Sequence, residues 1–171
     1  MIFKKELVVL CGGEGMRVRH LYPGLPKVLF PLRGRPFLDY LLTHFYIQGI
    51  RNFILATGYL GEEISKYREE SPFKKLITLS QESSFLGTAG AVKLAQRYIK
   101  SSDFFVTNGD SLCGIRLSKL LKIHMDKHAV ATIGIATADK RKDGGNININ
   151  SQSRITSFNE KKGKSVYINA G

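Results

Sequence analysis

The chain has 171 residues, of which 43% are hydrophobic, and a net charge of +12 at pH 7. This length favours one domain or slightly more, no apolar run approaches the ~20 residues of a membrane span, and the first residues lack the uninterrupted apolar region of a signal peptide. The positive charge favours an acidic partner, but the basic residues do not form the aromatic-interleaved stripe of single-strand binders, which argues against a nucleic-acid function.

Short apolar runs alternate with amphipathic stretches along the first 136 residues. The apolar runs predict strands, and the spacing of apolar residues in the longer stretches predicts helices. The predicted strands are Leu7–Leu10, Phe53–Ala56, Leu76–Leu79, Phe104–Val106 and Val130–Ala136. The predicted helices are Phe37–Gln48, Glu62–Glu70, Thr88–Ile99 and Leu117–Lys127. This alternation is typical of an α/β fold, a Rossmann-like, mostly parallel sheet with helices on both faces.

Open parallel sheets bind their ligands at the carboxyl ends of the strands. Four segments follow predicted strands and are expected at that edge: Gly12–Arg19, Gly58, Gln81–Gly87 and Asn108–Ser111. Beyond residue 140 the pattern changes to short β-like runs joined by Gly and Asn turns. These runs, which predict a small antiparallel excursion near the C-terminus, are Asn146–Asn150, Arg154–Phe158 and Val166–Ile168.

The loop after the first predicted strand contains Gly12, Gly13 and Gly15. Glycine adopts positive φ and has no Cβ to hold a ligand away, so the backbone amides of such a loop can cradle phosphate oxygens. Arg17 and Lys27 add positive charge, which suits a triphosphate. The loop is not a P-loop, because no Gly-Lys-Ser/Thr follows, and it lacks the third glycine of the dinucleotide fingerprint.

The two cysteines, Cys11 and Cys113, are far apart in the sequence and have no Cys-x-x-Cys spacing. We expect both to be small buried side chains of a reduced, cytoplasmic protein.

The run Leu10-Cys-Gly-Gly-Glu-Gly-Met-Arg-Val, followed by Pro26-Lys27, resembles the signature of the sugar-1-phosphate nucleotidyltransferases, Leu-Ala-Gly-Gly-x-Gly-Thr-Arg-Leu…Pro-Lys. Met16 departs from it by removing a hydroxyl that could bond a phosphate. The resemblance implies a glycosyltransferase-A-like fold and a single nucleotidyltransferase domain over residues 1–171, C-terminally incomplete relative to the family. By this match the nucleotide is bound by Leu10, Gly12, Gly13 and Gly15.

Two further motifs support the resemblance on the nucleotide side. Leu86-Gly87-Thr88-Ala89-Gly90-Ala91 looks like the family segment that lies against the base and ribose, and we expect Thr88 to cap the helix that begins there. Glu82 lies just upstream; its carboxylate suits the N1–H and N2 amino group of guanine, although an ordinary surface role fits it equally well. Asp110 follows a predicted strand. It is expected to hold Mg²⁺, the alternative being a turn aspartate.

The last motifs concern the sugar phosphate. Phe158-Asn-Glu160-Lys161 and Tyr167-Ile-Asn169-Ala-Gly171 match the family pattern Phe-x-Glu-Lys…[Ile/Val]-Asn-[Ala/Gly]-Gly. The match implies that Glu160 binds sugar hydroxyls, that Lys161 binds the sugar's phosphate, and that Asn169 and Gly171 line the sugar pocket. Gly145 would pass close to the sugar.

The resemblance implies a reaction in which a sugar-1-phosphate attacks the α-phosphorus of a nucleoside triphosphate, giving a nucleotide-sugar and pyrophosphate. In it Arg17 stabilises the leaving pyrophosphate, Lys27 holds the α-phosphate, and Mg²⁺ on Asp110 bridges nucleotide oxygens. The motifs look most like those of heptose-1-phosphate or mannose-1-phosphate guanylyltransferases of lipopolysaccharide or capsule biosynthesis. Two alternatives stay open: an inactive nucleotide-binding relic, and an enzyme that uses UTP or dTTP with glucose-1-phosphate. Whether the protein forms a homo-oligomer also stays open.

Overall fold

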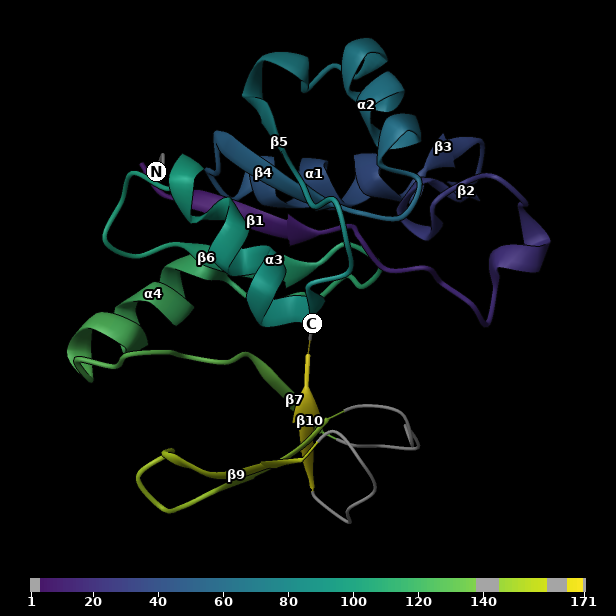
Figure 1. Ribbon diagram of the computed structural model, residues 1–171. Coiled ribbons are helices and arrows are strands. Elements are labelled where there is room, and N and C mark those ends of the chain that lie inside the picture. Colours follow the sequence, from purple (N-terminus) through teal and green to yellow (C-terminus); the bar gives the residue numbers. More distant parts are fainter. Residues whose placement is uncertain (1–3, 138–144, 160–165, 171) are drawn as a thin grey trace. The chain divides into compact units, whose positions relative to one another are not determined.

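The computed structural model describes residues 4–137, 145–159 and 166–170 (Figure 1). They belong to two compact units, Met1–Leu112 and Cys113–Gly171. Within the described ranges, no helix has both the length and the apolar character needed to cross a membrane.

A four-stranded parallel sheet forms the centre of the first unit. Its order is β5-β4-β1-β6. The register pairs Leu10 of β1 with Ala56 of β4 on one side and Asn108 of β6 on the other. The strands are β1 (Glu6–Leu10), β4 (Asn52–Thr57), β5 (Ile77–Gln81) and β6 (Phe105–Asn108), which confirms the four strands predicted for this region.

Helices cover both faces of this sheet, as predicted. On one face α3 (Gly87–Ala95) buries Ala95 against Val8 and Ile54. On the other side of the sheet lies α1 (Phe37–Ile47), as Figure 1 shows, with four buried apolar side chains at helical spacing. The remaining helical elements are α2 (Gly61–Glu70) and the short 3-10 turns η1 (Arg19–Leu21), η2 (Lys27–Leu29), η3 (Lys74–Leu76) and η4 (Gln96–Tyr98).

A small hairpin between the glycine loop and α1 was not predicted. It pairs β2 (Pro31–Leu32) with β3 (Arg35–Pro36). The two residues that join the strands, Arg33 and Gly34, have φ values of 50° and 81°, and positive φ at both loop positions is the hallmark of the tight hairpin turn.

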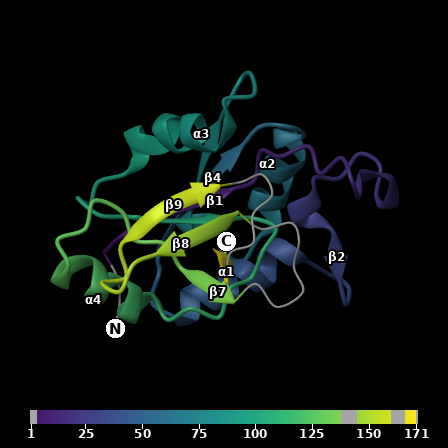
Figure 2. The ribbon, with the colours of Figure 1, turned by 90° about the horizontal axis from the view of Figure 1, so that it is seen from below.

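The second unit contains α4 (Leu117–Asp126) and a four-stranded sheet in the order β7-β10-β8-β9. Every pairing in this sheet is antiparallel, which confirms the predicted excursion. Figure 2 shows β7, β8 and β9 from below. The buried apolar residues of this sheet include Ile147 and Ile168. The strands are β7 (Ile135–Thr137), β8 (Asn146–Ile149), β9 (Ile155–Asn159) and β10 (Tyr167–Asn169).

Three predictions require correction. The strand predicted at Val130–Ala136 is shorter and begins at Ile135, because pairing with β10 starts only there. Thr88 does not cap α3: the helix begins at Gly87, so Thr88 lies inside its first turn, where a hydroxyl cannot take the cap position. Cys11 is buried as expected, whereas Cys113 is only partly buried.

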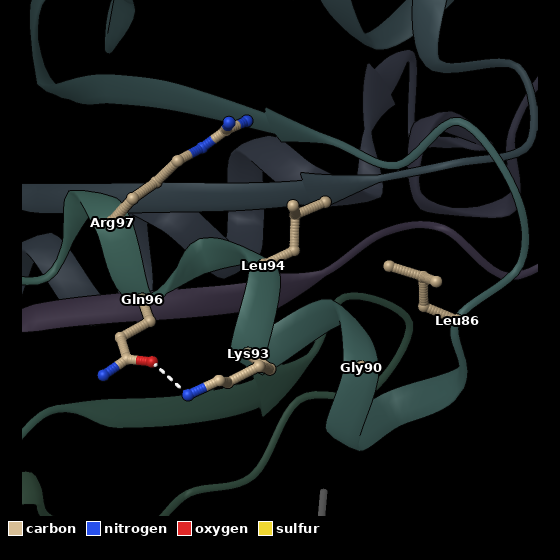
Figure 3. A pocket seen from close by; sticks show the side chains of 6 residues that line it. All are labelled: Leu86, Gly90, Lys93, Leu94, Gln96 and Arg97. Atoms are coloured by element: carbon tan, nitrogen blue, oxygen red, sulfur yellow. Dashed lines mark hydrogen bonds between the residues drawn. The ribbon is translucent and has the colours of Figure 1, made fainter.

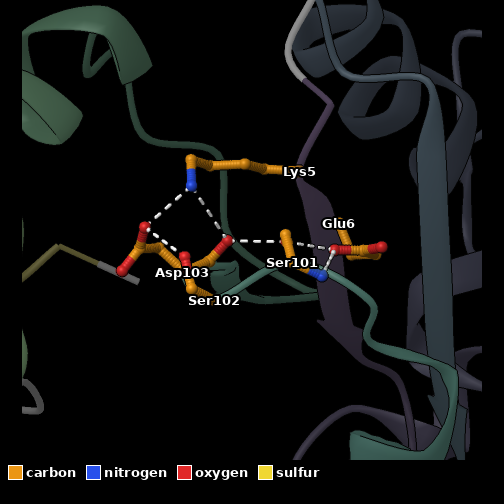
Figure 4. A network of polar contacts seen from close by, with 5 residues as sticks. All are labelled: Lys5, Glu6, Ser101, Ser102 and Asp103. Atoms are coloured by element: carbon orange, nitrogen blue, oxygen red, sulfur yellow. Dashed lines mark hydrogen bonds and ion pairs between the residues drawn. The ribbon is translucent and has the colours of Figure 1, made fainter.

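The N-terminal end of β1 is fixed by a buried carboxylate (Figure 4). Glu6 is 4% exposed and accepts hydrogen bonds from the backbone amides of Lys100 and Ser101, at 3.1 and 3.3 Å, and from the Ser101 hydroxyl. The Asp103 carbonyl oxygen, 2.8 Å from Oγ of Ser101, is an alternative acceptor for the single proton of this hydroxyl. Lys5 pairs with the Asp103 carboxylate at 2.8 Å. The network fastens the segment that leads into β6.

Candidate functional site

The loops at the carboxyl ends of the parallel strands are tied to one another by backbone hydrogen bonds. The amide of Cys11 donates to Ala56, and that of Gly109 donates to Leu10, at 2.8 and 2.9 Å. The amide of Glu82 donates to Thr57 at 2.9 Å. The four segments predicted at this edge therefore meet there, on the side of the sheet where such folds bind ligands.

The glycine loop is open to solvent. Gly13 and Arg17 are exposed, and Gly12 is only partly buried. Gly15 has a φ of 58°, and a Cβ built on it would lie 3.2 Å from Cβ of Lys27. This position therefore needs glycine both for its backbone conformation and for the close approach of Lys27.

Lys27 and Asp110 form an ion pair beside this loop, although 83 residues separate them. The Lys27 Nζ lies 2.7 Å from Oδ2 of Asp110, and both side chains are more than a third exposed. Ser111 donates its hydroxyl to Oδ1 of Asp110 at 3.1 Å. Burial opposes the ionisation of Asp110, but the contacts with Lys27 and Ser111 outweigh it and lower the pKa of that carboxyl. Asp110 is therefore an anion at neutral pH.

A divalent cation at this site would need ligands beyond the side chains. Among the described residues, no three His, Cys, Asp or Glu side chains gather closely enough to hold a metal ion. Mg²⁺, however, keeps several waters and is commonly bound by one or two carboxylates together with substrate phosphates. The ionised, half-exposed Asp110 fits a Mg²⁺ ion that is completed by nucleotide oxygens, and it does not fit a closed metal cage.

Glu82 lies against the first glycine of the loop. A Cβ built on Gly12 would be 3.1 Å from Oε1 of Glu82, and one built on Gly58 only 2.5 Å from the same atom. The other carboxylate oxygen accepts the amide of Leu86 at 3.2 Å. Glu82 thus joins the loops after β1, β4 and β5. It also provides the carboxylate near the start of α3, where the sequence suggested the Thr88 hydroxyl.

The other nucleotide-side residues follow from this arrangement. Leu10 is the last residue of β1 and leads directly into the loop. Gly87 has a φ of 70° at the first position of α3. Thr88, the next residue, is exposed.

An open groove of about 770 Å³ lies beside α3 (Figure 3). Lys93 and Gln96 are hydrogen bonded to each other there at 2.8 Å. The groove is lined by Leu86, Gly90, Lys93, Leu94, Gln96 and Arg97. Leu86 and Gly90 belong to the segment expected against the base and ribose, but none of the described residues predicted to bind phosphate lines this groove. These predicted phosphate ligands therefore lie at the strand ends and not in this groove.

Two of the predicted sugar residues are neighbours in the second unit. The amide of Asn169 in β10 donates to the carbonyl of Gly145 at 3.0 Å. A Cβ on Gly145 would lie 3.1 Å from Cζ of Phe158, so a larger residue there would need the Phe158 ring to shift. The other sugar-side residues, Glu160, Lys161 and Gly171, lie outside the described residues.

Comparison with known proteins identifies the class. The sequence profile described as nucleotidyl transferase matches residues 6–171. The chain therefore belongs to the nucleotidyl transferase family, as the motifs predicted.

Individual relatives differ in base and sugar. The chain is 34% identical to D-glycero-alpha-D-manno-heptose 1-phosphate guanylyltransferase of Campylobacter jejuni, over 91% of this chain and 68% of that protein. It is 32% identical to a probable glucose-1-phosphate cytidylyltransferase of Bacillus subtilis, over 97% of this chain and 72% of that protein.

A solved structure supports the fold. HddC from Yersinia pseudotuberculosis, complexed with GMP-PN, superposes with a TM-score of 0.78 and 26% identity, covering 97% of this chain and 74% of that one. The chain is thus short relative to these proteins.

Proposed function

We propose that this protein transfers GMP from GTP to a sugar-1-phosphate of the heptose or mannose type, releasing pyrophosphate. The observation that carries the proposal is the position of Lys27 and Asp110, which the fold brings to within 2.7 Å of each other beside the open glycine loop. A cation and an anion at one phosphate-binding loop suit a substrate that consists of a polyphosphate and a divalent metal.

The reaction requires little acid–base catalysis. The attacking sugar phosphate is already an anion, so the protein must align it with the α-phosphorus and offset the repulsion between the two substrates. In our proposal the amides of Gly12, Gly13 and Gly15 hold the triphosphate, Lys27 holds the α-phosphate, and Arg17 stabilises the leaving pyrophosphate. Glu160, Lys161, Asn169, Gly145 and Gly171 are the proposed ligands of the sugar phosphate.

Asp110 is the residue proposed to hold Mg²⁺. When bound, this ion neutralises phosphate charge and fixes the geometry of the triphosphate oxygens. In the bound state the Lys27 ammonium leaves Asp110 and turns to the α-phosphate. The ion pair between Lys27 and Asp110 would thus be replaced by a contact of Lys27 with the α-phosphate and one of Asp110 with Mg²⁺. Metal and nucleotide are therefore expected to bind together.

The Glu82 carboxylate is suited to bind guanine. An ionised carboxylate accepts hydrogen bonds and donates none, and guanine presents two adjacent donors, N1–H and the N2 amino group. The guanylyltransferase relative and the GMP-PN complex of HddC support this base. Gly87 and Thr88, at the start of α3, are proposed to lie against the base and ribose. A heptose guanylyltransferase of this kind would act in the cytoplasm and serve lipopolysaccharide or capsule synthesis.

The test is a pyrophosphate-release assay on the full chain with Mg²⁺. Each of GTP, CTP, UTP and dTTP is paired with heptose-1-phosphate, mannose-1-phosphate and glucose-1-phosphate. We expect release only when both substrates are present, and fastest with GTP and one of the first two sugars. Fastest release with another base would overturn the guanine assignment, and GTP binding without any release would favour a nucleotide-binding relic.

A further inference from the structure

Gly58, the first residue after β4, stands out because the space over its Cα is filled by one side chain. A Cβ built there would lie 2.5, 3.1 and 3.2 Å from Oε1, Cγ and Cδ of Glu82. Real Cβ atoms do not approach other atoms to 2.5 Å. Gly58 is not among the glycines with positive φ. The constraint at this position is therefore space and not backbone conformation.

The bare backbone of Gly58 lets the Glu82 carboxylate lie across the end of β4. From there Oε1 also reaches the edge of Gly12, at 3.1 Å from its built Cβ, and Oε2 accepts the amide of Leu86. A carboxylate has about four lone-pair sites. The bond from Leu86 takes one of them. Within the described part of the chain no other hydrogen bond to this carboxylate is found, so its remaining sites can serve a ligand beside the glycine loop.

We propose that Gly58 is a positioning residue for base recognition: its missing side chain sets the place of the Glu82 carboxylate against guanine. This inference rests on the proposed role of Glu82 in the reaction. A methyl group at position 58 displaces Oε1 from the end of β4. The carboxylate then no longer faces the N1–H and N2 amino group together.

Binding of GTP and inosine triphosphate to the full chain, measured by calorimetry with Mg²⁺, tests the inference. The two nucleotides differ only in the N2 amino group. Since a hydrogen bond to a charged group is worth a factor of about ten or more, we expect the protein to bind GTP about tenfold more tightly. Gly58→Ala should reduce the ratio of the two affinities to about twofold, mainly by weakening the binding of GTP. Gly114→Ala is the matched control, because a Cβ there meets nothing within 4 Å and the ratio should stay unchanged.

A double-mutant cycle separates positioning from a general structural effect. Glu82→Ala should abolish the preference for GTP, and adding Gly58→Ala should then change it no further. If Glu82→Ala leaves the preference intact, the proposed base contact fails. If Glu82→Ala removes the preference but Gly58→Ala retains it, only the role of Gly58 is overturned.

Folding provides a second readout. Should Gly58→Ala not fold, the double variant Gly58→Ala/Glu82→Ala should fold with a Tm near that of Glu82→Ala, because the clash partner is gone. A double variant that also fails to fold would show that Gly58 is needed for another reason, and would overturn the inference.

Discussion

The two ends of β1 hold their polar groups in opposite ways. At the N-terminal end, the buried Glu6 carboxylate is bonded by amides and a hydroxyl of the protein itself. At the C-terminal end, the glycine loop is open, and the charged pair of Lys27 and Asp110 is half exposed. Five residues of strand thus separate an end whose bonds serve folding from an end whose groups can exchange partners with a ligand.

Glu6 is therefore a structural carboxylate, and Asp110 is a carboxylate that a ligand can reach. Burial opposes the charge on Glu6, yet the bonds from Ser101 and Lys100 lower its pKa. Burial also opposes the charge on Asp110, and there the opposing contacts come from Lys27 and Ser111. Since Lys27 is itself a proposed phosphate ligand, we expect substrate binding to release Asp110 from its ion pair and to leave the bonds of Glu6 unchanged.

The largest expected effect is on turnover at the open end. Lys27→Ala or Asp110→Ala should slow pyrophosphate release by a factor of about 10²–10³, because each removes a charge that acts on the reacting phosphates. Circular dichroism should show an unchanged fold. Lys122→Ala, which breaks an exposed ion pair with Asp126, is the control and should keep full turnover. Near-normal turnover in either site variant would contradict these roles.

The next largest effect is on the stability of the folded protein and concerns Glu6 at the N-terminal end of β1. Glu6→Ala leaves the amides of Lys100 and Ser101 without their buried acceptor, so we expect a loss of about 3 kcal/mol in the free energy of unfolding. Urea denaturation measures it. Glu69→Ala, which removes a carboxylate exposed to water and paired with Lys74, should leave this free energy nearly unchanged. Equal losses in both variants would contradict the structural role of Glu6.

The pH dependence of stability sharpens the same contrast. The pKa of Glu6 is lowered in the folded state, so the unfolded chain binds a proton first as the pH falls. The stabilisation from Glu6 is complete well above its unfolded pKa of about 4.3. It is lost as the pH falls through that value toward the folded pKa. Stability curves between about pH 6 and 3 should be flatter for Glu6→Gln than for the unchanged protein; parallel curves would refute the assignment.

The smallest effect concerns metal binding without nucleotide. Lys27→Met frees Asp110 from its ion pair, so the affinity of the free protein for Mn²⁺ should rise by a factor of about two to five. Electron paramagnetic resonance of bound Mn²⁺ measures this. The control Lys93→Met removes the same charge from a lysine that contacts the neutral Gln96 and should have no effect. Equal affinities in the Lys27→Met variant and the unchanged protein would mean that the ion pair does not compete with the metal.

Much of the fold could be predicted from the sequence because buried strands consist of short runs of apolar residues. Leu7–Leu10 and Phe53–Ala56 each lie within a strand of the structure. The hairpin of β2 and β3 escaped prediction because strands of two residues carry no periodicity. The turn at Arg33 and Gly34 was the only available signal.

The candidate site was predictable in its location and less so in its contacts. The glycine loop and Asp110 follow strands, so the parallel topology brings them to one edge. The ion pair of Lys27 with Asp110 and the packing of Glu82 on Gly58 depend on side-chain directions in loops, which no repeating pattern records. A glycine directly after a buried strand, at the same edge as the glycine loop, was the signal for Gly58.

In our proposal the open end of β1 binds the nucleotide. The most direct measurement is an NMR titration of the ¹⁵N-labelled protein with Mg²⁺–GTP, following the backbone amides. We expect the largest saturable shifts at Gly12, Gly13 and Gly15, and we expect Lys27→Ala to weaken the binding that these shifts report. Shifts confined to the groove beside α3, at Lys93 and Arg97, with the glycine amides unmoved, would contradict it.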